Sequence, residues 1–136
     1  MIKIATTSVF VDDQRKAQAF YTDVLGFETR VDVPIGDAVW LTVGAAGAQP
    51  DVELLLEPGD SEIAKTYTSS LRKAGLPAIV FSVDDLAAEF ERLSALGVRF
   101  VQEPVEYGPI IMAVIDDTVG NLLQLVQPLP PPVSQD

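Results

Sequence analysis

The sequence predicts an α+β fold in which two tandem βαβββ modules form curved mixed sheets around a cleft. Two observations carry this prediction: an internal repeat, and within each copy one amphipathic helical pattern surrounded by short runs of β-forming residues. The chain has 136 residues, which fits one structural domain with a core of its own. Hydrophobic residues make up 48% of the chain and charged residues 21%, a balance typical of globular proteins.

The repeat consists of three matched blocks that occur in the same order in both halves of the chain. The blocks, first copy and then second, are residues 11–13 and 83–85 (Val-Asp-Asp), residues 25–26 and 96–97 (Leu-Gly), and residues 52–55 and 123–126. Three blocks in one order indicate a duplication of a single structural unit.

Each copy contains one helical pattern with a start and a stop signal. In the first copy Asp12 or Asp13 is suited to cap the helix, and Gly26 suits the left-handed position just past its end. In the second copy aspartates at residues 84–85 precede the helix and Gly97 follows it. The apolar stripes are Ala17, Phe20, Tyr21, Val24 and Leu25 in the first copy and Leu86, Phe90, Leu93 and Leu96 in the second.

Short runs rich in β-formers surround both helical patterns, so each copy reads strand, helix and three strands. The runs are residues 2–11, 27–33, 38–43 and 52–56 in the first copy and residues 78–83, 99–101, 110–115 and 122–126 in the second. We therefore expect a first module over residues 1–58, a linker helix within 59–76 and a second module over 77–127. The proline-rich segment 128–136 is expected to be a disordered tail.

Composition excludes several classes of function. The net charge of −11 repels phosphate backbones and anionic lipids, which argues against nucleic-acid and membrane partners. It favours a cationic ligand, although acidity also simply keeps a protein in solution. The chain has no histidine and no cysteine, so imidazole bases, histidine-ligated zinc and thiolate chemistry are excluded. The N-terminus lacks the pattern of a signal peptide and the apolar runs are too short to cross a bilayer, so we expect a cytoplasmic protein.

Three stretches of the sequence resemble the vicinal-oxygen-chelate superfamily, which includes glyoxalases, bleomycin resistance proteins and dioxygenases. VFVDDQRKAQAFYTDVLGF (residues 9–27) resembles the opening strand and helix of that family. IVFSVDDLAAEFERLSALGV (79–98) resembles its second module, and DDTVGNLLQL (116–125) resembles its final Asp-x-x-Gly-Asn strand. The resemblance covers residues 2–127 and implies the same paired βαβββ fold, a ligand cleft and a homodimer.

The resemblance also implies where a divalent metal would be held. It places the four ligand positions at Thr6, Glu53, Ala78 and Gln124, where metal-binding members mostly carry histidine at the first and third positions and usually glutamate at the fourth. Alanine offers no ligand, and a hydroxyl or an amide is a weak neutral one. One carboxylate by itself does not hold Zn²⁺, Ni²⁺ or Fe²⁺ against water, so we expect no metal and no cofactor.

Glu53 is then the central residue of the predicted site. On a strand face that lines the cleft it would bind a cationic or hydroxyl group of a ligand, or act as a general base and hence as the catalytic residue of an enzyme. Alternatively that face is turned to solvent, or Glu53 pairs with a lysine or arginine. Thr6 and Gln124 would be neutral hydrogen-bonding partners, and Ser8 and Phe10 share the strand parity of Thr6.

Two aromatic residues complete the predicted ligand-binding set. Trp40, the only tryptophan, would stack on a planar ligand or, alternatively, fill a core or subunit-interface position. Tyr107 precedes Gly-Pro and would cover the mouth of the cleft or simply belong to a turn.

Three functions remain open at this point. The first is metal-independent binding or sequestration of a small molecule, with a cationic drug suited to the acidic surface. The second is an enzyme, either a lyase, isomerase or dioxygenase with an altered site or a metal-free enzyme that uses Glu53 as a base. The third is a non-catalytic regulatory subunit. Fold alone does not separate them, because one fold hosts unrelated chemistries.

Overall fold

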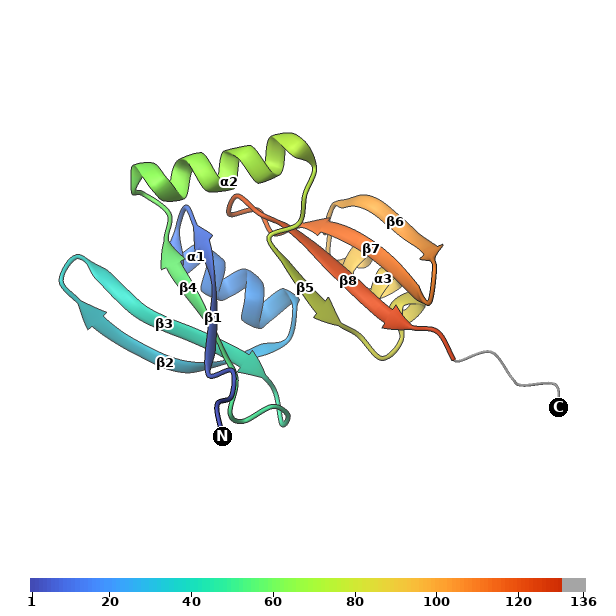
Figure 1. Cartoon of the computed structure of the whole chain (residues 1–136), viewed down its shortest axis with the longest axis horizontal. Helices are drawn as coiled ribbons and strands as arrows, with labels where there is room; N and C mark the ends of the chain where they lie inside the picture. The colour runs from blue at the N-terminus through green and yellow to red at the C-terminus, as the bar shows by residue number, and fades with distance from the viewer. Residues whose placement is uncertain (131–136) are drawn as a thin grey trace, which may run out of the picture.

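The computed structural model describes residues 1–130 and contains two mixed four-stranded sheets (Figure 1). The first unit comprises β1 (Thr6–Val11), α1 (Gln14–Ala19) continued by a π-helical turn η1 (Phe20–Val24), β2 (Phe27–Ile35), β3 (Ala38–Ala45) and β4 (Glu53–Pro58). The second unit comprises β5 (Ile79–Ser82), α3 (Leu86–Ala95), β6 (Phe100–Tyr107), β7 (Ile110–Asp116) and β8 (Leu122–Pro128). The helix α2 (Glu62–Ala74) runs between the units. These elements confirm the predicted α+β class with two βαβββ units.

Both sheets have the same topology, with strand orders β1-β4-β3-β2 and β5-β8-β7-β6. The first and last strands of each unit are parallel neighbours, and the other neighbours are antiparallel. A parallel pair cannot be joined by a tight hairpin, so the helix and two strands between them return the chain to the start of the sheet. The identical strand order identifies the two units as copies of one structural module.

The aspartates and glycines predicted to start and end the helices lie at the ends of the helical segments in both units. The carboxylates of Asp13 and Asp85 accept hydrogen bonds from backbone N–H groups in the first turns of α1 and α3. Gly26 and Gly97 follow the two helical segments with φ of +87° and +83°. Glycine adopts this left-handed conformation without the steric cost that a Cβ brings.

The first strand is shorter than the sequence indicated. It was expected from residue 2 but begins at Thr6, because its partner β4 begins at Glu53. The N–H of Glu53 donates to the carbonyl of Ala5, which ends the ladder. High β-propensity at Ile2 and Ile4 does not produce a strand where no partner strand exists.

Two elements of the second unit are longer than expected. The strand predicted over residues 99–101 is β6, which runs to Tyr107, and its register shifts between Gln102 and Val105 hide the alternation of apolar residues. The segment 128–136 was expected to be a disordered tail, but its first residues are ordered. The last strand, β8, ends at Pro128, and the N–H of Leu129 donates to the carbonyl of Pro109. The remainder of that prediction, residues 131–136, lies outside the described residues.

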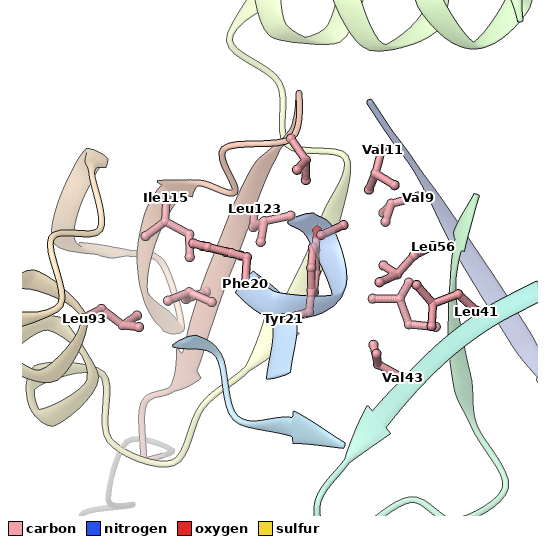
Figure 2. Close-up of a cluster of buried hydrophobic side chains, with 14 of the residues drawn as sticks. Val9, Val11, Phe20, Tyr21, Leu41, Val43, Leu56, Leu93, Ile115 and Leu123 are labelled. Atoms are coloured by element: carbon pink, nitrogen blue, oxygen red, sulfur yellow. The ribbon is translucent and has the colours of Figure 1, made fainter. Parts of the chain in front are cut away.

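The hydrophobic core lies between the two units and not inside each one separately. Figure 2 shows Phe20 and Tyr21 between side chains of the first sheet and side chains of the second. We call the sheet faces that contribute to this core the covered faces and the opposite faces the open faces. The covered faces carry Val9, Val11, Leu41, Val43, Leu54 and Leu56 in the first unit and Ala113, Ile115, Leu123 and Leu125 in the second. Both covered faces contribute to this one core, which leaves the open face of each sheet uncovered by it.

A buried polar cluster joins the two units at the edge of this core. Asp117 is fully buried and its carboxylate accepts hydrogen bonds from the Tyr21 hydroxyl (2.8 Å), the Asn121 side-chain amide (2.9 Å) and the N–H groups of Val119 and Asn121. The Asn121 amide also donates to the carbonyl of Phe10 at 2.8 Å. Tyr21 and Phe10 belong to the first unit, so the Asp-x-x-Gly-Asn turn of the second unit holds both units together.

Burial determines the acidity of this cluster. The pKa of Asp117 is raised because burial penalises its charge more than the hydrogen bonds from Asn121, Val119 and Tyr21 offset. The pKa of Tyr21 is raised well above its ordinary value by burial and then by the adjacent carboxylate of Asp117. Both groups therefore favour their protonated forms more than they would in water.

Candidate functional site

The open face of the first sheet carries most of the residues predicted to bind a ligand. Along β1 the side chains alternate, so Thr6, Ser8 and Phe10 lie on the open face while Val9 and Val11 are buried in the core. Glu53 lies on the same face, because it is the register partner of Thr6 in the parallel β1–β4 pair. Figure 1 shows β1 and β4 side by side in this sheet. The structure therefore brings Thr6, Ser8, Phe10 and Glu53 together.

Trp40 also lies on this face and is 43% exposed. The alternative that it fills a core position is therefore wrong for the single chain. The β3–β4 register pairs Thr42 with Leu55, and further along the two strands Trp40 and Glu57 lie beside one cavity. This cavity has a volume of ≈ 160 Å³, and both Trp40 and Glu57 line it.

Glu57 was not among the residues predicted to bind a ligand. Its signal was available, since Glu57 lies four residues after Glu53 on the same strand and strand side chains repeat on one face every second residue. It was missed because the strand was expected to end at residue 56, two residues before its end at Pro58.

The strands β3 and β4 separate beside this cavity. Only two residue pairs, Thr42–Leu55 and Val43–Leu54, lie in register between them. Beyond these pairs the side-chain amide of Gln14 bridges the two strands. Its oxygen accepts a hydrogen bond from the N–H of Val39 at 3.1 Å, and its nitrogen donates to the carbonyl of Val39 at 2.7 Å. The same amide donates to the carbonyl of Leu56 at 2.8 Å. The Gln14 side chain, which reaches the strands from the covered side, thus replaces hydrogen bonds that β3 and β4 do not make with each other. The open side remains recessed at this point.

The open face of the second sheet carries Gln124 and Tyr107, which therefore do not meet the residues of the first sheet within one chain. Tyr107 is 74% exposed at the end of β6. Gln124 is the register partner of Val80, which is 53% exposed. Other apolar side chains share this face, among them Val105 and Met112, which are paired in the β6–β7 ladder.

The register corrects one part of the expected site. Gln124 was aligned with Glu53, the register partner of Thr6, but it lies opposite Val80. Asp13 and Asp85 cap the corresponding helices of the two units, and Ser8 and Val80 each lie five residues before these aspartates. Val80 is therefore the counterpart of Ser8, which is paired with Leu55. Gln124 therefore corresponds to Leu55. The strand pairing continues so that the N–H of Ala78 donates to the carbonyl of Leu122, and Leu122 occupies the fourth position.

These positions do not fit a divalent metal. The first unit offers the hydroxyl of Thr6 and the carboxylate of Glu53, whereas the second offers the aliphatic side chains of Ala78 and Leu122. One carboxylate and one hydroxyl leave a transition metal without enough ligands. Within residues 1–130 no group of three or more His, Cys, Asp or Glu side chains is placed to hold a metal ion.

The charges on the two open faces differ. Glu53 and Glu57 give the first face two carboxylates, and no ion pair within residues 1–130 involves either of them. On the second face Asp116 is paired with Arg72 of α2, and the rest of the face is neutral where Val80 and Gln124 lie. Among the described residues no helix is long and apolar enough to span a membrane.

One further feature fixes the far end of the first open face. Arg30 lies at the register shift of β2, and its guanidinium donates to the carbonyls of Ala45, Ala48, Gln49, Pro50 and Val52. A Cβ at Gly44 would fall on this guanidinium, so glycine leaves the space that Arg30 occupies. Arg30 thereby holds the loop that leads into Glu53.

Comparison with known proteins supports the resemblance seen in the sequence. The profile of the Glyoxalase/Bleomycin resistance protein/Dioxygenase superfamily matches residues 3–125. The uncharacterized protein YurT of Bacillus subtilis (strain 168) is 46% identical over 126 residues, which cover 93% of this chain and 99% of YurT.

Two solved structures are similar over nearly the whole chain. UcmS2 has a TM-score of 0.80 and 37% identity, with 93% of this chain and 98% of UcmS2 covered. TnmS3, an antibiotic binding protein from Streptomyces sp. CB03234, has a TM-score of 0.73 and 29% identity, with 94% of this chain and 97% of TnmS3 covered.

Proposed function

The chain belongs to the glyoxalase/bleomycin resistance protein/dioxygenase superfamily, and from this premise we propose that it binds and sequesters a small organic molecule, without a metal, in clefts that two copies form together. The single observation that carries the proposal is the position of the open faces. Residues suited to contact a ligand lie on the open faces of both sheets, and the chain itself closes neither face.

A second copy completes such a site in the simplest way. The open face of one sheet would be placed opposite the open face of the partner's other sheet, and a two-fold axis would then generate two equivalent clefts. Exposed apolar side chains on both faces support this arrangement, including Val33, Ile35 and Trp40 on the first and Val80 and Val105 on the second.

The chemistry of the residues favours binding over catalysis. The sequence contains no imidazole and no thiol, and the donor set does not fit a metal. Glu53 has a hydroxyl neighbour, Thr6, and is suited to accept a hydrogen bond from a ligand. The likeness to TnmS3 supports the same class of function, and the net charge of −11 supports a basic ligand.

The test uses oligomeric state and probe binding together. We expect sedimentation velocity to show a dimer and the neutral probe N-phenyl-1-naphthylamine to gain fluorescence on binding. Val80→Glu places a charge on the second open face and should weaken both dimer and probe signal at least tenfold, a change of about 1.4 kcal/mol.

A matched control separates this from a general loss of apolar surface. Leu96 is 55% exposed at the end of α3, away from both open faces, so Leu96→Glu should leave dimer and probe binding unchanged. Circular dichroism checks that both variants fold. A monomeric wild-type chain that does not bind the probe, or an equal effect of Leu96→Glu, would contradict the proposal.

A further inference from the structure

An acidic side chain lies between two aromatic ones across the first open face. In the β1–β4 pair Phe10 is the register partner of Glu57, and on the other side Trp40 and Glu57 line one cavity. Because β4 lies between β1 and β3 in the sheet, Phe10, Glu57 and Trp40 form one transverse row with the carboxylate in the middle. Tyr67 of α2 extends the row, because its ring meets Phe10 edge to face with 6.1 Å between ring centroids.

The row borders a recess that the fold maintains. The cavity of ≈ 160 Å³ beside Trp40 is lined by Leu55, Glu57 and Pro58, and it lies where β3 and β4 separate. Gln14 satisfies the separated backbone from the covered side, so the recess does not depend on a ligand to fill it. A cavity of this size accommodates the head of a small molecule and not a whole drug.

We propose that the row of Phe10, Glu57 and Trp40 is the subsite for a quaternary or protonated ammonium group of the ligand. Aromatic faces attract such cations through the ring quadrupole, and tryptophan does so best. The carboxylate of Glu57 supplies the opposite charge, and no cation among residues 1–130 forms an ion pair with it. This inference rests on the proposed function and names the ligand group that the first open face selects.

The cation is assigned to Glu57 and not to Glu53. Arg30, which also pairs with Glu28 at 3.3 Å, places a guanidinium at the Glu53 end, where it donates to the carbonyl of Val52, the residue before Glu53. This neighbouring charge makes that end less favourable for a second cation. Glu57 lies four residues further along β4, away from that guanidinium and between aromatic rings.

The test compares choline with 3,3-dimethylbutan-1-ol, in which carbon replaces the charged nitrogen and the shape is kept. Trp40 is the only tryptophan, so its indole N–H gives a single NMR signal that reports on the subsite. We expect choline to shift this signal with a saturable curve, at a Kd on the order of 1 mM. The neutral isostere should bind at least about tenfold more weakly.

Matched variants locate the charge that matters. Glu57→Gln should weaken choline binding about tenfold, which corresponds to about 1.4 kcal/mol, and more than Glu53→Gln does, whereas Glu91→Gln, at an exposed position of α3, should leave it unchanged. Phe10→Leu should also weaken choline binding, and its backbone amide spectrum checks the fold. Equal binding of choline and the isostere, an unaffected Glu57→Gln variant, or a larger loss in Glu53→Gln would overturn the inference.

The same protein samples separate this outcome from failure of the proposed function. Binding of N-phenyl-1-naphthylamine without any preference for choline over its isostere would leave small-molecule binding intact and remove the ammonium subsite. Absence of both kinds of binding would remove the proposed function itself.

Discussion

The covered and the open faces of the two sheets carry different kinds of residue. The covered faces of both units hold aliphatic side chains at corresponding positions, such as Leu54 and Leu56 in β4 and Leu123 and Leu125 in β8. The open faces do not correspond in this way. Where the first has the hydroxyl of Ser8, the second has the aliphatic side chain of Val80.

This difference shows what the duplication retained. Packing density limits what a core position accepts, so both copies keep similar side chains there. The open faces are free of that limit within one chain and have diverged into an acidic, aromatic face and a neutral, apolar one. In this protein the two faces differ too much to supply equal halves of a metal site, and they are suited to contact different parts of one ligand.

The largest effect on stability is expected where the covered faces meet at Asp117. Asp117→Ala would leave the Tyr21 hydroxyl, the Asn121 amide and two backbone N–H groups without their acceptor in a buried place. Each unsatisfied buried group costs about 1–3 kcal/mol, so the free energy of unfolding should fall by at least about 3 kcal/mol. Urea denaturation followed by circular dichroism measures it.

The adjacent Asp116 is the matched control for this variant. Its carboxylate faces the open side, where it pairs with Arg72 and accepts from the N–H of Thr118. The Arg72 side chain is 41% exposed and the Asp116 side chain 13%, so solvent reaches the pair through Arg72 and Asp116→Ala should cost about 1 kcal/mol. Equal costs for the two aspartates would show that Asp117 does not join the units as the hydrogen bonds indicate.

Most of the fold could be predicted from the sequence, because residues on the covered faces are apolar and recur with the period of a helix or a strand. The stripe of Phe20, Tyr21 and their neighbours predicted the first helix, and Asp13 and Asp85 marked both helix starts. Strand ends were less accurate, since pairing partners decide them. Ile2 and Ile4 have high β-propensity and remain outside β1 because no strand continues beside them.

The candidate site was only partly predictable for the same physical reason. Local parity placed Ser8 and Phe10 on the face of Thr6, but register between strands is a tertiary property. Gln124 was therefore aligned two residues away from its true counterpart. Periodicity also did not show that the covered faces of the two units share one core, because it indicates that a face is buried but not what it is buried against.

The pH dependence of stability should differ between the two neighbouring aspartates. The raised pKa of Asp117, caused mainly by burial, means that its contribution is fully present below its ordinary value of 3.8 and is lost as pH rises through the folded value. The pKa of Asp116 is lowered, since hydrogen bonds from Arg72 and Thr118 outweigh the effect of burial. Its contribution is present above 3.8 and is lost as pH falls through the folded value.

Asp117→Asn and Asp116→Asn make these opposite signs measurable. As pH falls from about 7 toward 3.8, the stability of the wild-type chain relative to Asp117→Asn should increase. Relative to Asp116→Asn it should stay constant over that range and decrease below 3.8. A parallel response of the two variants in urea denaturation at several pH values would contradict the assignment.

The smallest effect on stability is expected on the open face, from Glu53→Gln. The Glu53 side chain is half-buried and, among residues 1–130, takes part in no ion pair, so the free energy of unfolding should change by less than about 0.5 kcal/mol. The next residue on the strand, Leu54, lies on the covered face and is 5% exposed. Leu54→Ala is the reference for a covered position, with an expected cost of about 2–5 kcal/mol. If Glu53→Gln also cost more than about 1 kcal/mol, Glu53 would be part of what holds the single chain together, and the division between a covered face that stabilises and an open face that binds would fail at this strand.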